Sequence, residues 1–167
     1  MLCGDDAPLA IVDIDGVVAD VRHRLHHIEG RRKSWRRFFD AAGDDGLHEE
    51  GRAVVERLRK DHEVVYLTGR PRWLHAVTDA WLAEHGLGGH RLVMRPDDDR
   101  RPAVQLKVEV LCRLAIDRKI GIVVDDDARV IRAMAEAGFP TFHADWEQRA
   151  LDEQRALSQA QEEEGRT

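Results

Sequence analysis

Short apolar runs alternate with amphipathic stretches along most of this chain, and this alternation constrains the fold more than any other feature. The apolar runs, rich in valine and isoleucine, cover residues 9–14, 64–67, 92–94 and 120–124, with a weaker one at 141–142. Stretches with helical spacing lie between them, at 53–59, 73–84, 104–115 and 128–137. Such short continuous runs are typical of strands buried on both faces. The order of strand and helix predicts an α/β fold of three layers, with helices on both faces of a central parallel sheet.

Two segments depart from this alternation. Residues 22–50 are polar and interrupted by glycine, with a helical pattern only around 34–41, which is typical of an insert. From Glu147 onward almost no large apolar residue occurs, which predicts an exposed helical or disordered tail. The length of 167 residues suits one domain. We therefore expect a single domain over residues 1–146 with a small insert at about 22–50, followed by a tail at 147–167.

Charge and cysteine content limit the partners and the compartment. The chain carries 26 lysine and arginine residues against 32 aspartate and glutamate residues, a net charge of −6. A nucleic acid would therefore need a local basic face. Cys3 and Cys112 are too few for a disulfide framework, and no apolar run approaches a membrane span. These features predict a cytoplasmic protein without a membrane segment.

Polar residues directly follow three of the predicted strands. They are Asp13, Asp15 and Gly16 after the first strand, Thr68, Gly69 and Arg70 after the second, and Asp125, Asp126 and Asp127 after the fourth. Lys107 lies in the predicted helix before that fourth strand. Ligands of an open α/β sheet bind outside the carboxyl ends of the strands. Each segment alone is as typical of a turn or a helix cap, but their order along the chain favours one catalytic site.

The residue types in these segments suit phosphoryl transfer. Asp13 and Asp15 point to the same side of an extended segment, so one carboxylate can attack phosphorus while the other handles a proton. That attack requires a hard cation to neutralise charge, and carboxylate ligands favour Mg²⁺ over zinc. Asp125, with Asp126 beside it, would complete the Mg²⁺ site. The donors that phosphate oxygens need are offered by Thr68, the Gly69 backbone and Lys107.

With these motifs the chain resembles the haloacid dehalogenase (HAD) superfamily of phosphotransferases over residues 9–145. The resemblance implies a three-layer Rossmann-like fold. The implied roles are nucleophile for Asp13, general acid and then base for Asp15, phosphate binding for Thr68 and Lys107, and Mg²⁺ binding for Asp13, the Asp15 carbonyl and Asp125, with Asp126 in support. Most members of this superfamily carry a cap domain that selects small substrates, either between the first and second motifs or between the second and third. Neither of these two gaps is long enough here for a full cap domain. The site should therefore be open, which suits a polynucleotide end or a phosphoprotein.

A narrower resemblance is to the 3′-phosphatase domain of phage-type polynucleotide kinase-phosphatases. Arg24 follows Asp13 at the spacing of that group's substrate-binding arginine, and residues 68–70 match its Ser-Gly-Arg motif. This resemblance implies that Arg24, Gly69 and Arg70 bind substrate. Ala103 departs from the pattern, because that group carries an acidic residue there. The chain holds no phosphate-binding loop of the kinase type, so we expect the phosphatase activity alone, with a separate kinase or ligase as a possible partner.

The insert is the basic part of this acidic protein. Between residues 22 and 37 there are seven basic residues and one acidic residue. Trp35, Phe38 and Phe39 could stack on a nucleobase beside them, or pack inward beneath a solvated helix face. We expect the histidines at 23, 26 and 27 to lie on the surface, and Trp73 and Trp81 to belong to the core or an interface.

The sequence thus favours a Mg²⁺-dependent phosphomonoesterase that acts through an aspartyl-phosphate on the 3′ ends of DNA or RNA. Two alternatives remain. The first is a nucleotidase or small-molecule phosphatase with the same chemistry. The second is a non-catalytic nucleic-acid-binding module, although no motif residue is missing.

Overall fold

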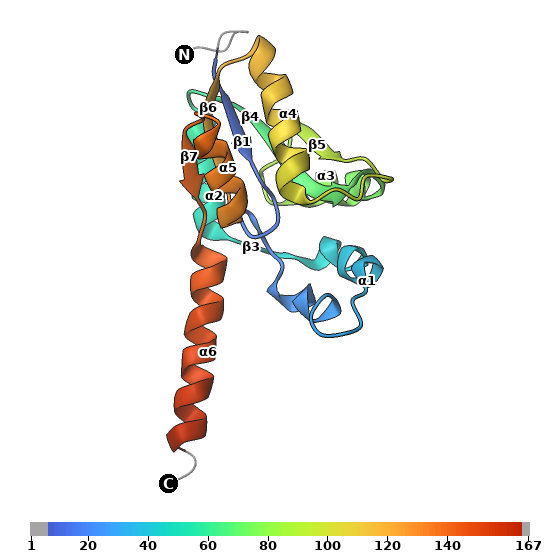
Figure 1. Cartoon of the computed structure of the whole chain (residues 1–167), viewed down its shortest axis with the longest axis vertical. Helices are drawn as coiled ribbons and strands as arrows, with labels where there is room; N and C mark the ends of the chain where they lie inside the picture. The colour runs from blue at the N-terminus through green and yellow to red at the C-terminus, as the bar shows by residue number, and fades with distance from the viewer. Residues whose placement is uncertain (1–6, 165–167) are drawn as a thin grey trace.

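The computed structural model describes residues 7–164 and has a five-stranded parallel sheet at its centre (Figure 1). The strand order is β5-β4-β1-β6-β7, and every neighbouring pair is parallel. The strands are β1 (Leu9–Val12), β4 (Glu63–Pro71), β5 (Arg91–Arg95), β6 (Ile120–Asp125) and β7 (Thr141–His143). The predicted α/β architecture with a parallel sheet is confirmed.

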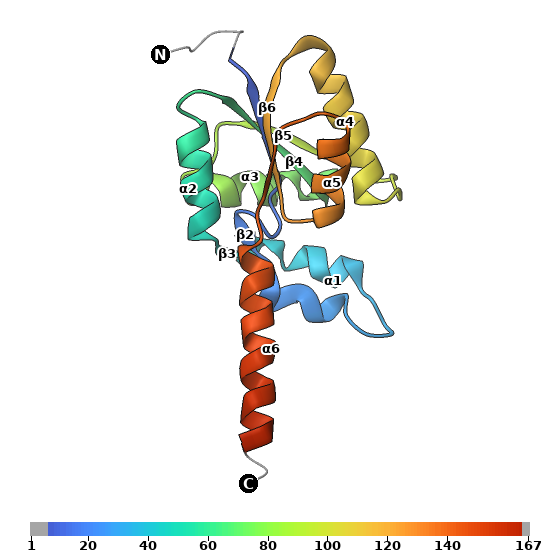
Figure 2. The ribbon, with the colours of Figure 1, turned by 60° about the vertical axis from the view of Figure 1, so that its left-hand side comes forward.

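Helices cover both faces of the sheet and close two hydrophobic cores (Figure 2). On one face, α2 (Glu49–Leu58) and α3 (His75–Glu84) contribute Val55 and Trp81 to the first core. On the other, α4 (Ala103–Asp117) and α5 (Ala128–Glu136) contribute Leu111 and Met134 to the second. The sheet is therefore the middle of three layers, as predicted.

Two element boundaries differ from the sequence prediction for identifiable reasons. Helix α2 begins at Glu49 and not at residue 53, because Gly51 is no helix breaker here. A Cβ at Gly51 would lie 1.9 Å from the carbonyl oxygen of Val17, so only glycine lets the helix pack this closely. Strand β4 continues to Pro71 beyond the predicted end at residue 67. Three of the polar residues expected just after this strand are therefore part of it.

A small antiparallel ribbon, formed by β2 (Ala19–Asp20) and β3 (Gly46–Leu47), connects the insert to the rest of the protein. Between these strands lie only short elements. They are the 3₁₀ helices η1 (Arg22–His27) and η2 (Ala42–Asp44) and the helix α1 (Trp35–Asp40). Figure 1 places the insert beside the carboxyl edge of the sheet. Within the described chain no large cap domain is present, which confirms that expectation.

Helix α6 (Trp146–Glu164) extends away from the sheet and the helices that cover it, which together we call the sheet domain (Figures 1 and 2). Its start is firmly packed, because the Trp146 indole N–H donates to the carbonyl oxygen of Val17 over 3.0 Å. Glu147 is also buried, although the sequence places it in the exposed tail. None of the helices within residues 7–164 combines the length and apolar composition that crossing a membrane requires.

Several single residues can be compared with their expected positions. Trp81 is a core residue as expected, whereas Trp73 keeps 44% of its surface exposed and is not a core residue. His23 and His26 are exposed, and His27 is half-buried. Of the two cysteines, Cys112 is exposed, and Cys3 lies outside the described residues.

Candidate active site

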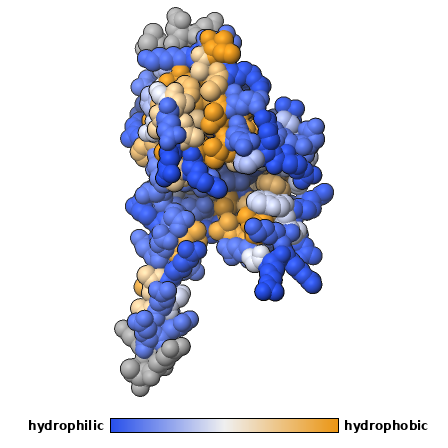
Figure 3. All heavy atoms as spheres, viewed as in Figure 1, coloured by the Kyte–Doolittle hydropathy of each residue, from blue (hydrophilic) through white to orange (hydrophobic). Residues whose placement is uncertain are grey.

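The carboxyl ends of β1, β4 and β6 open into one cleft of about 1300 Å³. The sheet domain forms its floor, and the insert and the first turns of α6 form its walls. The predicted site residues that line it are Asp13, Asp15, Thr68, Gly69, Lys107 and Asp126. Figure 3 shows apolar surface where the insert meets the sheet domain. The parallel topology therefore brings together residues that are far apart in sequence.

Lys107 forms ion pairs with two carboxylates, that of Asp13 just after β1 and that of Asp125 at the end of β6. Its ammonium nitrogen lies 2.8 Å from Asp13 Oδ2 and 2.6 Å from Asp125 Oδ2. All three side chains are buried. Burial alone would lower the pKa of Lys107, but Asp13 and Asp125 outweigh it and raise that pKa. A fixed positive charge thus lies beside the carboxylate that the sequence predicts as nucleophile.

An acidic cluster surrounds this lysine. Ligand oxygens of Asp13, Asp125 and Asp126 all lie within 4.8 Å of one another. Burial raises the pKa of Asp13 to about 7, against the opposing charge of Lys107. Burial also raises the pKa of Asp126 to about 9, and the neighbouring carboxylates add to this rise. One lysine therefore does not offset the burial and mutual repulsion of the three carboxylates, and ionising all of them requires further positive charge. The all-oxygen donor set fits a hard divalent cation.

Gly16 allows the tight turn that brings this cluster together. Its φ is +78°, in the left-handed region that favours glycine. A Cβ at this position would lie 2.1 Å from Asp126 Oδ2. The close approach of Asp126 therefore gives a second reason for glycine at this position.

Two arginines hold Asp15. Arg70 Nη2 lies 2.6 Å from Asp15 Oδ1, and Arg24 Nη2 lies 3.0 Å from the same oxygen. Both guanidinium groups are fully buried, and both also bind Asp45, Arg24 over 2.6 Å and Arg70 over 2.7 Å. The two arginines therefore lie behind Asp15, between it and Asp45. Their predicted direct contact with substrate stays a prediction.

The arginines also set the charge state of Asp15. Burial alone would raise the pKa of Asp15, but the charges of Arg70 and Arg24 outweigh it and hold that pKa below its ordinary value. The side chain keeps 25% of its surface exposed and lines the cleft. Asp15 is therefore an ionised, oriented carboxylate that can reach a bound molecule.

Thr68 and Gly69 occupy the end of β4 at the cleft floor. The Thr68 hydroxyl oxygen accepts a hydrogen bond from the Arg70 backbone N–H over 3.1 Å. The Gly69 carbonyl oxygen accepts one from Arg95 Nε over 3.1 Å. Since its oxygen serves as the acceptor, the Thr68 hydroxyl can still donate to a ligand.

Sequence reasoning missed two residues of the site. Asp45 binds both arginines that hold Asp15, yet in the sequence it is one more acid in a polar Asp-Asp-Gly turn. Glu147 accepts a hydrogen bond from the Val21 backbone N–H over 2.9 Å and contacts the His48 ring. It also lines the cleft. No sequence signal marks Glu147, because its partners Val21 and His48 lie 126 and 99 residues away.

Solved structures of known proteins share this fold. A chain of the Pnkp1/Rnl/Hen1 RNA repair complex superposes with a TM-score of 0.68 at 21% identity, covering 82% of this chain and 42% of that one. A chain of another Pnkp1/Rnl/Hen1 complex gives 0.67 at 24% identity, covering 83% and 45%. A haloacid dehalogenase-like hydrolase from Streptococcus pneumoniae gives 0.55 at 9% identity, covering 82% and 84%. At these identities the likeness establishes the fold.

The family comparison is more specific. The family described as the phosphatase domain of polynucleotide kinase PNKP matches residues 7–147, which is most of the chain. The chain therefore belongs to the PNKP phosphatase-domain family. No curated protein matches the chain in a sequence search. The chain spans less than half the length of the two repair-complex chains that it matches.

Proposed function

We propose that this protein is a Mg²⁺-dependent phosphomonoesterase that forms an aspartyl-phosphate on Asp13 and acts on the 3′-phosphorylated ends of polynucleotides. The observation that carries the proposal is the meeting of Asp13, Asp15 and Lys107 on the floor of one open cleft. A nucleophilic carboxylate, a proton carrier and a fixed cation are the groups that this chemistry requires.

The phosphate binds where positive charge and donors converge. Lys107, Thr68 and Gly69 line the cleft. There the Lys107 ammonium and the Thr68 hydroxyl would donate to the phosphoryl oxygens, beside the Gly69 backbone. Mg²⁺ would be held by Asp13, the Asp15 backbone carbonyl and Asp125, with Asp126 in support. When bound, it neutralises the charge that builds up between a carboxylate and a phosphate dianion. The acidic cluster described above supports this assignment.

In the first half of the reaction, a carboxylate oxygen of Asp13 attacks phosphorus and the ester P–O bond breaks. The leaving oxygen takes a proton from Asp15, so the product is a free hydroxyl group and an acyl phosphate on Asp13. In the free protein, Asp15 is an ionised carboxylate. The negative charge of a bound phosphate favours protonation of Asp15, because like charges raise a carboxyl pKa.

In the second half, water attacks the phosphorus of the aspartyl-phosphate. Asp15 now takes a proton from this water, inorganic phosphate leaves, and the Asp13 carboxylate is restored. Arg24 and Arg70 hold Asp15 in one orientation through both halves. The net reaction consumes one water and converts a phosphomonoester into an alcohol and phosphate.

The shape and charge of the cleft support a large substrate. No cap covers the cleft within the described residues, and the insert beside it carries the exposed basic side chains of Arg31, Arg32 and Lys33. Basic residues beside a phosphate site attract a polyanion. Because structural relatives come from an RNA repair complex, we infer that the chain supplies the phosphatase step of nucleic acid end repair, alongside a separate kinase or ligase.

The test is phosphate release with Mg²⁺ from three substrates at equal concentration: a 3′-phosphorylated oligonucleotide, a 5′-phosphorylated oligonucleotide and a free 3′-nucleotide. We expect a strong preference for the 3′-phosphorylated oligonucleotide, and no release in the presence of a chelator. Equal or faster turnover of the free nucleotide would contradict the polynucleotide assignment and indicate a small-molecule phosphatase with the same chemistry.

A further inference from the structure

Two large aromatic side chains are exposed in the wall of the cleft. Trp35 and Trp73 keep 53% and 44% of their surfaces exposed, and both line the cleft that contains Asp13. They come from different parts of the fold, Trp35 from α1 of the insert and Trp73 from the 3₁₀ helix η3 (Arg72–Leu74) after β4. Single exposed aromatic residues are common on proteins, but two on one cleft wall indicate a binding surface.

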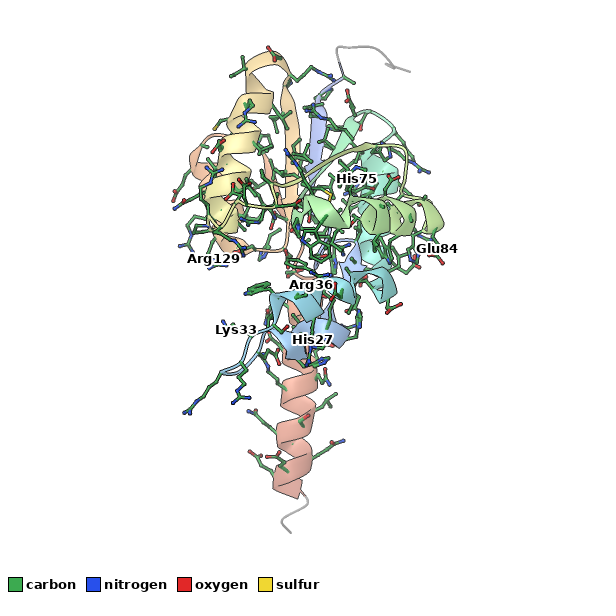
Figure 4. All side chains as sticks on the ribbon, turned by 90° about the vertical axis from the view of Figure 1, so that its right-hand side faces the viewer. His27, Lys33, Arg36, His75, Glu84 and Arg129 are labelled. Atoms are coloured by element: carbon green, nitrogen blue, oxygen red, sulfur yellow. The ribbon has the colours of Figure 1, made fainter. Side chains whose placement is uncertain are left out.

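These tryptophans belong to a continuous cluster. The Phe39 ring lies 5.9 Å from the Trp35 ring and 6.2 Å from the Trp73 ring, measured between centroids. The Arg36 guanidinium lies 5.0 Å from the centre of the Trp73 ring. We call these four residues, Trp35, Arg36, Phe39 and Trp73, the aromatic shelf. Figure 4 shows Arg36 where the insert meets the sheet domain.

Hydrogen bonds fix the backbone of both segments that carry the shelf, η3 and α1. The Trp73 backbone N–H donates to Asp97 Oδ1 over 3.0 Å, which ties η3 to the loop after β5. The Ser34 side chain caps the start of α1 by accepting from the Arg37 backbone N–H. Phe38, the neighbour that points inward, is buried under the Arg24 guanidinium. Of the two alternatives for the aromatics of this helix, Phe38 therefore packs inward, while Trp35 faces the cleft.

The chemistry of the shelf fits an unpaired nucleobase. Aromatic faces and arginine planes both stack on bases, and this contact tolerates any sequence because every base has a flat π-face. The exposed basic residues of the same insert suit the phosphodiester chain that follows the base. They are Arg31, Arg32, Lys33 and Arg37. Lys33 lies on the loop that projects from the insert (Figure 4).

We propose that the aromatic shelf stacks an unpaired base at the 3′-phosphorylated end of a single strand and so positions the terminal phosphate over Asp13. This inference rests on the proposed polynucleotide function. It adds that the protein recognises a base of the substrate as well as the terminal phosphate. Bases within a duplex already pair and stack with each other, so the shelf favours single-stranded ends.

The experiment compares two 3′-phosphorylated oligonucleotides that differ only in whether the last nucleotide carries its base. With the unmodified protein, we expect a lower KM for the oligonucleotide with the base. In Trp35→Leu, the KM for that substrate should rise about 5- to 150-fold, the range that loss of one stacked base gives. The KM for the abasic substrate should change much less. Trp35→Phe, which keeps an aromatic ring, should restore most of the difference.

Two controls separate stacking from other effects. Val77→Ala removes an exposed apolar side chain outside the cleft and should leave both KM values unchanged. The salt dependence of KM in Trp35→Leu should match that of the unmodified protein, because stacking releases no counterions.

Equal KM values for the two oligonucleotides in the unmodified protein would overturn the shelf assignment, as would an equal rise for both in Trp35→Leu. If the unmodified protein released no phosphate from either oligonucleotide, the polynucleotide function itself would fail. That failure is recognised before any variant is made, so the two ideas are tested separately.

Discussion

At the scale of single residues, the site depends on how buried charges are paired. Asp13 and Asp125 share Lys107, and Asp15 shares two arginines with Asp45. In a low-dielectric interior, removing one partner of such a pair leaves the other charge uncompensated. The first group, with Asp126 beside it, has more carboxylates than cationic groups and could hold a metal ion. The second group has two carboxylates and two guanidinium groups, and it orients Asp15.

Asp45 provides the sharpest residue-scale prediction. In Asp45→Asn, the buried guanidiniums of Arg24 and Arg70 lose a charged partner, so the free energy of unfolding should fall by about 3–5 kcal/mol. Because Asp15 loses its fixed orientation, kcat should fall by about a hundredfold. Urea unfolding and steady-state kinetics measure the two effects. The matched control is Asp44→Asn, since Asp44 is exposed next to Asp45. If both variants behaved alike, Asp45 would have no positioning role.

At the scale of secondary-structure elements, α6 is anchored at its first turn and free beyond it. Trp146 and Glu147 bind the backbone of residues 17 and 21, near the ribbon that carries the insert. Helix α6, the insert and the cleft wall thus share one set of contacts. The exposed residues beyond Leu151 add little to this anchoring.

We expect Glu147→Ala to loosen the start of α6. The Val21 backbone N–H loses its acceptor, and an unsatisfied buried donor costs about 1–3 kcal/mol of unfolding free energy. Limited proteolysis should then cut near residue 147 faster than in the unmodified protein. Glu153→Ala, an exposed position on the same helix, should leave the cleavage rate unchanged. Equal cleavage in the two variants would show that Glu147 does not anchor the helix.

At the scale of the whole molecule, the predictable parts of the structure are those with a local signal. The apolar runs gave the strands of the parallel sheet, and their polar ends placed Asp13, Thr68 and Asp125 at one edge. Asp45 and the anchoring role of Glu147 could not be predicted in this way. Their partners are brought near by packing between segments far apart in sequence, which leaves no periodic pattern. For the same reason, the sequence left open which aromatic residues of α1 face the cleft.

The stability of the whole protein should depend on pH and Mg²⁺ together. The pKa values of Asp13 and Asp126 rise on folding. Their contribution to the free energy of unfolding is therefore complete below about pH 4, and it is lost as the pH rises through about 7 for Asp13 and about 9 for Asp126. Because a divalent cation prefers ionised carboxylates as ligands, the proposed Mg²⁺ should restore stability mainly at high pH. We expect Mg²⁺ at about a hundredfold above its Kd to raise Tm by about 5–10 °C near pH 8.

Thermal unfolding with Mg²⁺ and with a chelator, at about pH 5 and about pH 8, checks this expectation. The shift in Tm should be clearly smaller at the lower pH, because protons compete with the cation for the carboxylates. A shift in Tm of the same size at both pH values would mean that the cation binds somewhere other than Asp13 and Asp126.

The central claim is that Asp13 becomes phosphorylated, and the most direct measurement traps that intermediate. The protein is mixed with Mg²⁺ and a 3′-³²P-labelled oligonucleotide, quenched in acid within one turnover, and digested for peptide mapping. We predict a label on the peptide that contains Asp13, and no label in Asp13→Asn, whose kcat should also fall by about a thousandfold or more. Label on another peptide, or turnover by Asp13→Asn at the rate of the unmodified protein, would contradict the account.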